Sequence, residues 1–174
     1  MKTITLTGMM GSGKSTVAKA LSQILNCELL EIDSLIEHSK KLIINEIFEK
    51  LGEKYFREVE KQTILTNAKP DNQIIAIGGG AFEDKETREF LLKNTTVIYL
   101  KTSSETIFQR IKNDTSRPLL NNQMSTEKIE EIIKKRQQNY EKATLTICTD
   151  NKTIEEITTE IRRGLGLWKN YKCT

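Results

Sequence analysis

The sequence predicts an α/β fold, a three-layer sandwich in which helices cover both faces of a five-stranded parallel sheet. Five short segments rich in β-branched residues alternate with helix-like stretches along the 174-residue chain. Most of these segments are nearly continuous apolar runs, which is typical of parallel strands buried on both faces. A glycine-rich turn also joins the first of them directly to a helix. The predicted strands span residues 4–7, 28–32, 74–77, 96–100 and 144–148.

Two helix starts are predicted from capping boxes, in which a Ser or Thr is followed three residues later by a Glu or Gln. Thr102 with Glu105 predicts one start, and Thr153 with Glu156 predicts the other. After the second box, apolar residues recur at helical spacing as far as Leu165. We therefore expect a C-terminal helix with one apolar face.

Length and composition exclude several classes of protein. A chain of 174 residues suits one compact domain, so we expect a single unit over residues 1–174. No stretch approaches the roughly 18 consecutive apolar residues of a membrane span. The net charge of +3 comes without a dense basic run, which argues against nucleic-acid binding. The three cysteines form no C-x-x-C pair, so we expect neither disulfides nor a zinc site, and a cytoplasmic location.

The turn after the first predicted strand carries a phosphate-binding motif. Residues 8–15, GMMGSGKS, match G-x-x-x-x-G-K-[ST] between a strand and a helix, the context that the motif requires. Glycines let backbone N–H groups approach the phosphates, and the helix N-terminus favours the anion. We expect Lys14 to bridge the terminal phosphates and Ser15 to bind magnesium. The predicted nucleotide-binding residues here are Gly11, Ser12, Gly13, Lys14, Ser15 and Thr16.

The alternative is a plain glycine-rich turn between strand and helix, and the flanking elements together with the extra Gly11 argue against it. In many P-loop enzymes a later strand ends in an acid that holds magnesium, whereas the third strand here ends without one. Glu31 and Asp33 lie at the end of the second predicted strand, at the sheet edge that faces the phosphates. Both are candidates for the metal site, and a polar strand terminus is the alternative.

Three consecutive glycines, Gly78, Gly79 and Gly80, follow the third predicted strand. They leave side chains out of the place where an α/β sheet opens its ligand crevice, so backbone donors can touch a substrate. We expect contact with the acceptor or with its incoming phosphate. A plain turn is the alternative.

A helix beginning at Ser125 is predicted to place Arg136 on its apolar face. An unpaired buried guanidinium costs several kcal/mol, so we expect a carboxylate of the protein or of a ligand to meet it. From this pattern alone, a structural ion pair and a ligand contact are equally open. The other residues on this face are Ile129, Ile132, Ile133 and Tyr140.

Two further arginines are ambiguous when taken alone. Arg57 fits an exposed helix face on which it pairs with Glu60 or Lys61, and this structural interpretation is favoured in isolation. Arg117 lies in a polar loop at about 113–123, where a mobile arginine can close over a transferring phosphoryl group and neutralise its charge.

Taken together, these segments resemble the shikimate kinase family over nearly the whole chain, in both order and spacing. FR-x-x-E, then a strand ending in GGG, then RPLL, is far more restrictive than the phosphate motif alone. The resemblance implies a P-loop, nucleoside-monophosphate-kinase-like fold with a substrate-binding segment at about 33–61 and a lid loop at about 113–123. The matching segments are GMMGSGKST, EIDSLIE, EKYFREVE, IGGGAF, SRPLL and KKRQQNYEKA.

For the acceptor site, the resemblance makes Asp33 the aspartate that hydrogen-bonds and aligns the acceptor hydroxyl, and it leaves a role as general base open. Arg57 and Arg136 correspond to the pair that holds the shikimate carboxylate, and two guanidinium forks on one carboxylate orient it well. Gly78, Gly79 and Gly80 correspond to the glycines beside the substrate ring.

For the nucleotide site, Arg117 resembles the lid arginine that reaches the phosphates, so that Lys14, Asp33 and Arg117 form the predicted catalytic set. Arg110 resembles the residue that covers the adenine, with a solvated helix arginine as the alternative. One departure is Glu31, which stands where the family usually has Asp. Because a water-mediated magnesium contact tolerates the longer side chain, we expect Glu31 to serve the metal through water.

The implied reaction is transfer of the γ-phosphoryl group of ATP to the 3-hydroxyl of shikimate, with Mg²⁺ as cofactor, by a monomer on the chorismate route to aromatic amino acids. A gluconate-type kinase is the alternative enzyme, but it has no reason to carry RPLL after GGG. A nucleoside monophosphate kinase needs a base-reading site and more lid arginines. A non-catalytic ATP-binding module tends to lose residues such as Lys14, Ser15 and Asp33, which are present here.

Overall fold

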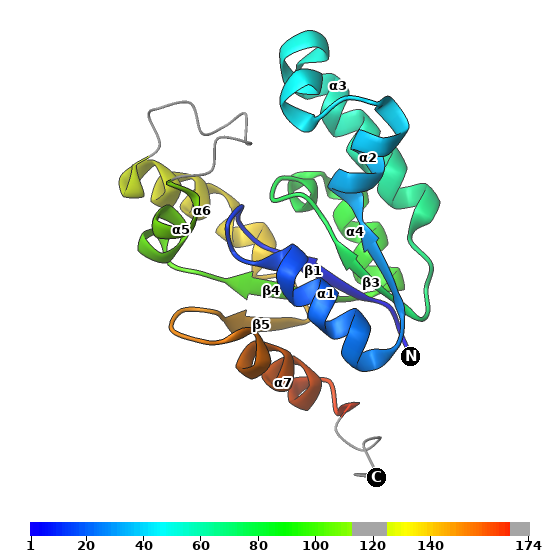
Figure 1. Ribbon diagram of the computed structural model, residues 1–174, viewed down its shortest axis with the longest axis vertical. Coiled ribbons are helices and arrows are strands. Elements are labelled where there is room, and N and C mark those ends of the chain that lie inside the picture. The colour runs from blue at the N-terminus through cyan, green and yellow to red at the C-terminus, as the bar shows by residue number, and fades with distance from the viewer. Residues whose placement is uncertain (113–124, 168–174) are drawn as a thin grey trace.

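The computed structural model describes residues 1–112 and 125–167. Within them, five strands form one parallel sheet in the order β2-β3-β1-β4-β5, with β1 at its centre (Figure 1). The predicted sheet is therefore confirmed. The strands are β1 (Ile4–Thr7), β2 (Glu28–Glu31), β3 (Gln73–Ala76), β4 (Thr96–Lys101) and β5 (Leu145–Cys148).

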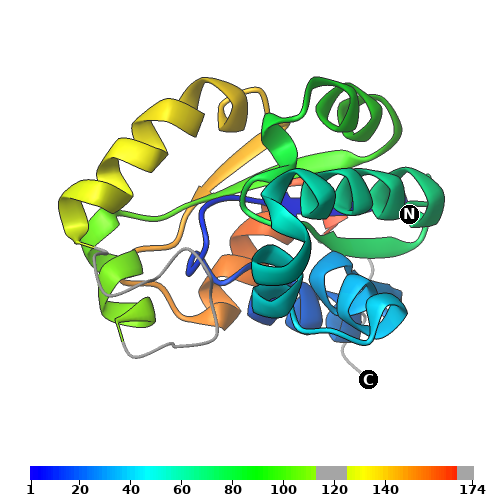
Figure 2. The same cartoon turned by 90° about the horizontal axis from the view of Figure 1, so that it is seen from above.

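Helices cover both faces of this sheet, as Figure 2 shows from above, so the three-layer arrangement is also confirmed. One face is covered by α1 (Lys14–Leu25) and α7 (Ile154–Gly164). The other packs against α2 (Ile32–Lys40), α3 (Ile44–Asn67), α4 (Lys85–Asn94), α6 (Thr126–Tyr140) and the short 3-10 helix η1 (Ala81–Glu83), and α5 (Ser104–Ile111) packs beside α6. Among the helices described, none is both long and apolar enough to cross a membrane.

The residues of β3 and its end show why the strands read as continuous apolar runs. Ile74 and Ala76 are buried in the cluster under α1 and α7, whereas Ile75 and Ile77 are buried in the cluster on the opposite face. Since successive side chains of a strand point to opposite faces, a sheet covered on both sides can bury consecutive apolar residues, whereas a sheet with one exposed face alternates apolar and polar residues. The same packing fixes the carboxyl ends of β1, β2 and β3 beside one another.

The end of β2 differs from the sequence-based expectation. The strand stops at Glu31, and Ile32 already begins α2, so Asp33 lies in the first turn of a helix and not at a strand end. Ile32 is fully buried, which anchors this helix start against the core. The predicted strand, residues 28–32, is therefore one residue longer than β2.

The capping box predicted at Thr102 is wrong, and the one at Thr153 is confirmed. Ser103 is the N-cap of α5, and its side chain accepts a hydrogen bond from the backbone N–H of Thr106 at 3.2 Å. The Thr102 hydroxyl is buried and bonds the Thr149 hydroxyl at 2.7 Å instead. Thr102 and Ser103 are both able to cap the helix, and Ser103 does so because the Thr102 hydroxyl is bonded to Thr149.

Asp150 ties the loop after β5 to the start of α5. Its carboxylate accepts hydrogen bonds from the backbone N–H of Ser103 at 3.1 Å and from the Ser103 hydroxyl at 2.9 Å. Partial burial works to raise the pKa of Asp150, but the hydrogen bonds from Thr106 and Ser103 outweigh it and lower this pKa.

We predict that Asp150→Ala lowers the free energy of unfolding by about 1–2 kcal/mol at pH 7, because it removes charge-assisted hydrogen bonds. An acid whose pKa is lowered in the folded state stabilises the fold above its ordinary pKa, and this contribution is lost as the pH falls through the folded-state pKa. Denaturant unfolding should therefore show wild type and variant converging in acid, below about pH 4. A stability difference that persists unchanged there would contradict this role.

Candidate active site

The predicted phosphate-binding loop runs from Gly8, directly after β1, to Gly13, and Lys14 and Ser15 form the start of α1. Gly13 is the N-cap of α1 with a φ of 91°, a left-handed conformation that favours glycine. The first turn of α1 contains no acidic residue and has no side-chain cap, so its N–H groups and dipole face outward toward any anion. Lys14 Nζ donates to the carbonyl oxygens of Gly8 at 2.9 Å and Met9 at 3.0 Å, so the lysine lies folded over its own loop.

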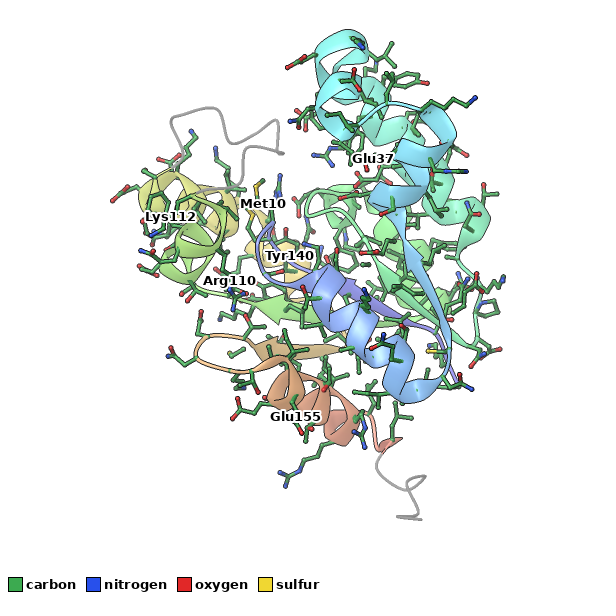
Figure 3. All side chains as sticks on the ribbon, viewed as in Figure 1. Met10, Glu37, Arg110, Lys112, Tyr140 and Glu155 are labelled. Carbon is green, nitrogen blue, oxygen red and sulfur yellow. The ribbon has the colours of Figure 1, made fainter. Side chains whose placement is uncertain are left out.

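A cavity of about 300 Å³ opens above this loop and brings together most of the predicted nucleotide and metal residues. Glu31 reaches it from the end of β2, and Asp33 reaches it from the first turn of α2. Arg110 reaches it from α5 and donates to the Gly11 carbonyl at 3.2 Å. Figure 3 shows Met10 on the loop and Arg110 on the neighbouring helix. The predicted site residues lining this cavity are Gly11, Gly13, Lys14, Ser15, Thr16, Glu31, Asp33, Gly78, Gly79 and Arg110.

A second cavity of about 480 Å³ adjoins the first at the turn after β3, since Gly79 lines one cavity and Gly80 the other. Arg57 from α3 and Arg136 from α6 both line it. The two arginines are far apart in the sequence, and the fold brings them to one space beside the phosphate loop. Glu53 and Glu60 of α3 line the same cavity.

Arg57 forms an ion pair with Glu60, in which Nη1 lies 2.8 Å from Oε2. Taken alone, the sequence pattern favours a pairing of Arg57 with Glu60 or Lys61 on an exposed helix face. The pairing with Glu60 is present, but the exposed face is wrong because the Glu60 side chain is only 1% exposed. Burial raises the pKa of Glu60 although the Arg57 guanidinium opposes the shift, and the nearby Asp33 carboxylate adds to it. Burial alone would lower the pKa of Arg57, but the Glu60 and Glu53 carboxylates raise it.

The glycines after β3 make room for these charged groups. A methyl group on Gly78 would collide with Glu60 Oε1 and lie 3.4 Å from Asp33 Oδ1, and one on Gly80 would lie 2.8 Å from the Arg57 guanidinium. At Gly79 a methyl group would lie 3.1 Å from the Met10 N–H nitrogen of the phosphate loop. The turn therefore admits no side chain at these positions because protein groups already approach closely.

Arg136 is half-buried and donates to the Gly79 carbonyl at 3.0 Å, with Met9 Sδ at 3.8 Å from the same nitrogen. Within the described residues, no carboxylate lies at ion-pair distance from Arg136. The same Gly79 carbonyl accepts from the hydroxyl of Tyr140, which is fully buried and stacks on Tyr99 with ring centroids 4.8 Å apart. Of the two partners expected for Arg136, the protein carboxylate is therefore absent from the described part of the chain.

The family profile described as shikimate kinase matches residues 10–165. The chain belongs to the shikimate kinase family. Among curated relatives, a shikimate kinase of a Sulfurihydrogenibium species is 40% identical over 167 residues, covering 94% of this chain and 99% of that protein. One of Thermodesulfovibrio yellowstonii is 38% identical over 172 residues and covers 99% of both chains.

Solved structures agree with this family assignment. A shikimate kinase from Acinetobacter baumannii in complex with shikimate superimposes with a TM-score of 0.90 at 34% identity, over 98% of this chain and 96% of that one. A gluconokinase from Sinorhizobium meliloti reaches a TM-score of 0.57 at 16% identity, over 95% of this chain and 92% of that one. At that identity the likeness shows a shared fold and gives no support to the gluconate alternative.

The residues present would suit a magnesium ion bound together with phosphate oxygens. In the part of the chain described here, no group of three or more His, Cys, Asp or Glu side chains is arranged to hold a metal alone. Ser15, Glu31 and Asp33 nevertheless line one cavity, and hydroxyl and carboxylate oxygens are ligands that Mg²⁺ accepts alongside phosphate oxygens and water.

Some predicted residues lie outside these cavities, and two cavity residues, Glu53 and Glu60, are not predicted as site residues. Ser12 is buried within the loop and does not line the cavity, and Arg117 lies outside the described residues, as does the proposed lid at 113–123. Glu60 is the last residue of the FR-x-x-E pattern. Its position three residues after Arg57 does not by itself show whether the ion pair with Arg57 is buried or exposed. Glu53 is marked in the sequence only by its i, i+4 spacing to Arg57, which ordinary exposed helix pairs share.

We predict that Gly78→Ala raises the acceptor KM by about tenfold or more, because the new methyl group pushes Glu60 away from Arg57. Affinity for ATP should change less than the acceptor KM, since the methyl group would meet Glu60 and Asp33 and not the backbone of residues 8–13. Overpacking should also lower the free energy of unfolding by about 1–3 kcal/mol.

Gly166→Ala provides the control in steady-state kinetics and ATP titration. A methyl group there meets no atom within 4 Å, although its φ of 65° strains any other residue. This variant should lose stability without a change in the acceptor KM. An acceptor KM that is also unchanged in Gly78→Ala would refute the crowding argument.

Proposed function

We propose that the chain transfers the γ-phosphoryl group of ATP to the 3-hydroxyl of shikimate, giving shikimate 3-phosphate and ADP. The observation that carries this proposal is the junction, at Gly79 and Gly80, between a phosphate-loop cavity and a cavity lined by two arginines. Membership of the shikimate kinase family supplies the identity of the acceptor. The relative solved with shikimate bound supports the same choice.

In this proposal, Arg57 and Arg136 hold the shikimate carboxylate. Both line one cavity, and the Arg136 guanidinium donates there to the neutral Gly79 carbonyl while lying within electrostatic reach of Tyr140 and Glu60, so an anionic ligand in this cavity would meet two guanidinium groups. Two guanidinium groups on one carboxylate fix its orientation as well as its position. Glu60 holds Arg57 from the buried side of the cavity.

Asp33 is proposed to accept a hydrogen bond from the attacking hydroxyl. It lines the phosphate cavity beside Gly78, close enough to Glu60 for the two carboxylates to interact. A hydroxyl held between Asp33 and the terminal phosphate would be aligned for in-line attack, and Asp33 would take its proton.

Lys14 would exchange its loop carbonyl partners for phosphate oxygens and stabilise the charge that develops during transfer. A magnesium ion held through Ser15, and through water by Glu31, would neutralise phosphate charge when bound. Arg110 is proposed to cover the adenine, and Arg117 to reach the transferring group; the role of Arg117 rests on the family resemblance. We further propose a cytoplasmic monomer with its acceptor-binding segment at about 33–61.

The reaction itself is tested by ADP release with magnesium-ATP in the presence of shikimate, of gluconate, or of no acceptor. We expect release only with shikimate, because its ring carboxylate suits the two arginines of one cavity and its 3-hydroxyl would be directed toward the phosphate cavity. If ADP release depended on gluconate, gluconate would take the place of shikimate as the proposed acceptor. If the chain bound ATP but released no ADP with any acceptor, the non-catalytic alternative would be favoured.

Arg57→Lys tests carboxylate recognition while keeping a positive charge beside Glu60. Because an ammonium lacks the planar fork, we expect the shikimate KM to rise by about tenfold to a hundredfold with the ATP KM nearly unchanged. Arg163→Lys, at an exposed position of α7, is the matched control and should behave as wild type. An unchanged shikimate KM in Arg57→Lys would remove Arg57 from the acceptor site.

A further inference from the structure

The outward edge of the Arg57 guanidinium is occupied by a second carboxylate, that of Glu53. Nε and Nη2 of Arg57 both donate to the single oxygen Oε1 of Glu53, at 3.3 Å and 3.1 Å. The edge formed by Nε and Nη2 is one of the two on which a guanidinium receives a carboxylate as a bidentate ligand. Glu53 lines the same cavity as Arg57, and this is the cavity in which the acceptor carboxylate is proposed to bind.

The two carboxylates on Arg57 differ in how readily they can leave. The Glu60 side chain is 1% exposed, whereas that of Glu53 is 58% exposed. A buried partner that left would strand a charge, but an exposed ion pair contributes little and its carboxylate is easily hydrated. Glu60 is therefore a permanent partner of Arg57, and Glu53 an exchangeable one.

The bonding geometry also favours exchange. Both donors converge on one oxygen of Glu53, whereas a ligand carboxylate can place one oxygen opposite each nitrogen and gain two parallel hydrogen bonds. A ligand that also reaches Arg136 gains a second guanidinium, which Glu53 does not contact.

The backbone at this point gives Glu53 room to move. Gly52, directly before it, has φ 84° and ψ 161° and interrupts α3, so Glu53 begins the second part of the helix one turn before Arg57. A side chain at Gly52 would meet no atom within 4 Å, so the break is not enclosed by packing.

We propose that Glu53 is an exchangeable counter-ion that occupies the place of the substrate carboxylate on Arg57 and must be displaced for the acceptor to bind. Glu53 thereby acts as a specificity-determining residue: a simple anion that engages one arginine competes poorly with it, and a carboxylate held by Arg57 and Arg136 together displaces it. The inference rests on the proposed function for the identity of the acceptor, but the competition at Arg57 does not depend on that identity.

Glu58 offers a matched control for the loss of one negative charge. It lines the same cavity from the same helix, but its carboxylate accepts from Gln62 at 3.0 Å and does not contact Arg57. Glu53→Gln and Glu58→Gln therefore remove the same charge from one cavity, and only the first removes the competitor.

The experiment measures the Kd of shikimate by calorimetry and the shikimate KM and kcat for wild type, Glu53→Gln and Glu58→Gln. We expect Glu53→Gln to lower the Kd and KM of shikimate by about twofold to fivefold, the range that loss of an exposed ion-pair competitor allows, with little change in kcat. Glu58→Gln should move neither constant by as much. Weaker shikimate binding in Glu53→Gln, or an equal gain in both variants, overturns the proposal.

A second measurement uses acetate, followed by the NMR signal of the Arg57 Nε–H group, and needs no shikimate. Acetate should perturb this signal in Glu53→Gln at a lower concentration than in wild type or Glu58→Gln. The same concentration dependence in all three proteins overturns the proposal even if shikimate proves not to be the acceptor. Failure of wild type to bind shikimate, with the acetate result as expected, would instead refute the proposed function alone.

Discussion

The site depends on one buried carboxylate, that of Glu60. A carboxylate at this depth is tolerated only beside a cation, and Arg57 provides it from the same helix. Its other oxygen lies against Gly78, which must lack a side chain for Glu60 to fit. The FR-x-x-E pattern of α3 and the glycines after β3 are therefore two parts of a single constraint, although they are separated in the sequence.

The burial of Glu60, which supports the binding site, also makes the stability of the fold depend on pH. Because burial raises the pKa of Glu60, the folded chain holds that proton more tightly than the unfolded chain does. The group therefore stabilises the fold most at low pH, and this contribution is lost as the pH rises through the folded-state pKa. The Arg57 guanidinium opposes this shift of the Glu60 pKa, and the pKa of Arg57 is itself raised by the Glu60 and Glu53 carboxylates.

Much of the fold could be predicted from sequence because its signals are local. Apolar residues of the strands are buried on both faces of the sheet, and the phosphate motif fixes one strand-to-helix turn. What could not be predicted depends on contacts across the chain. Thr102 and Ser103 are equivalent as caps until Thr149 bonds the first of them. Likewise, the spacing of Arg57 and Glu60 does not reveal that Gly78 lies against the pair. Nor does the sequence reveal that Arg136 donates to the Gly79 carbonyl and, among residues 1–112 and 125–167, has no carboxylate at ion-pair distance.

The order of strands in the sheet has a consequence for biosynthesis. β1 leaves the ribosome first, yet its neighbours in the sheet are β3 and β4, with Ile4 in register with Ile74 on one side and Thr96 on the other. Until those strands emerge, β1 has no sheet to join, and the phosphate loop that follows it has no fixed support. A nascent chain that ends before β4 therefore lacks a formed nucleotide site. During that interval β1 stays unpaired and its apolar side chains are exposed, so this is the stage of synthesis at which the chain is most prone to aggregate.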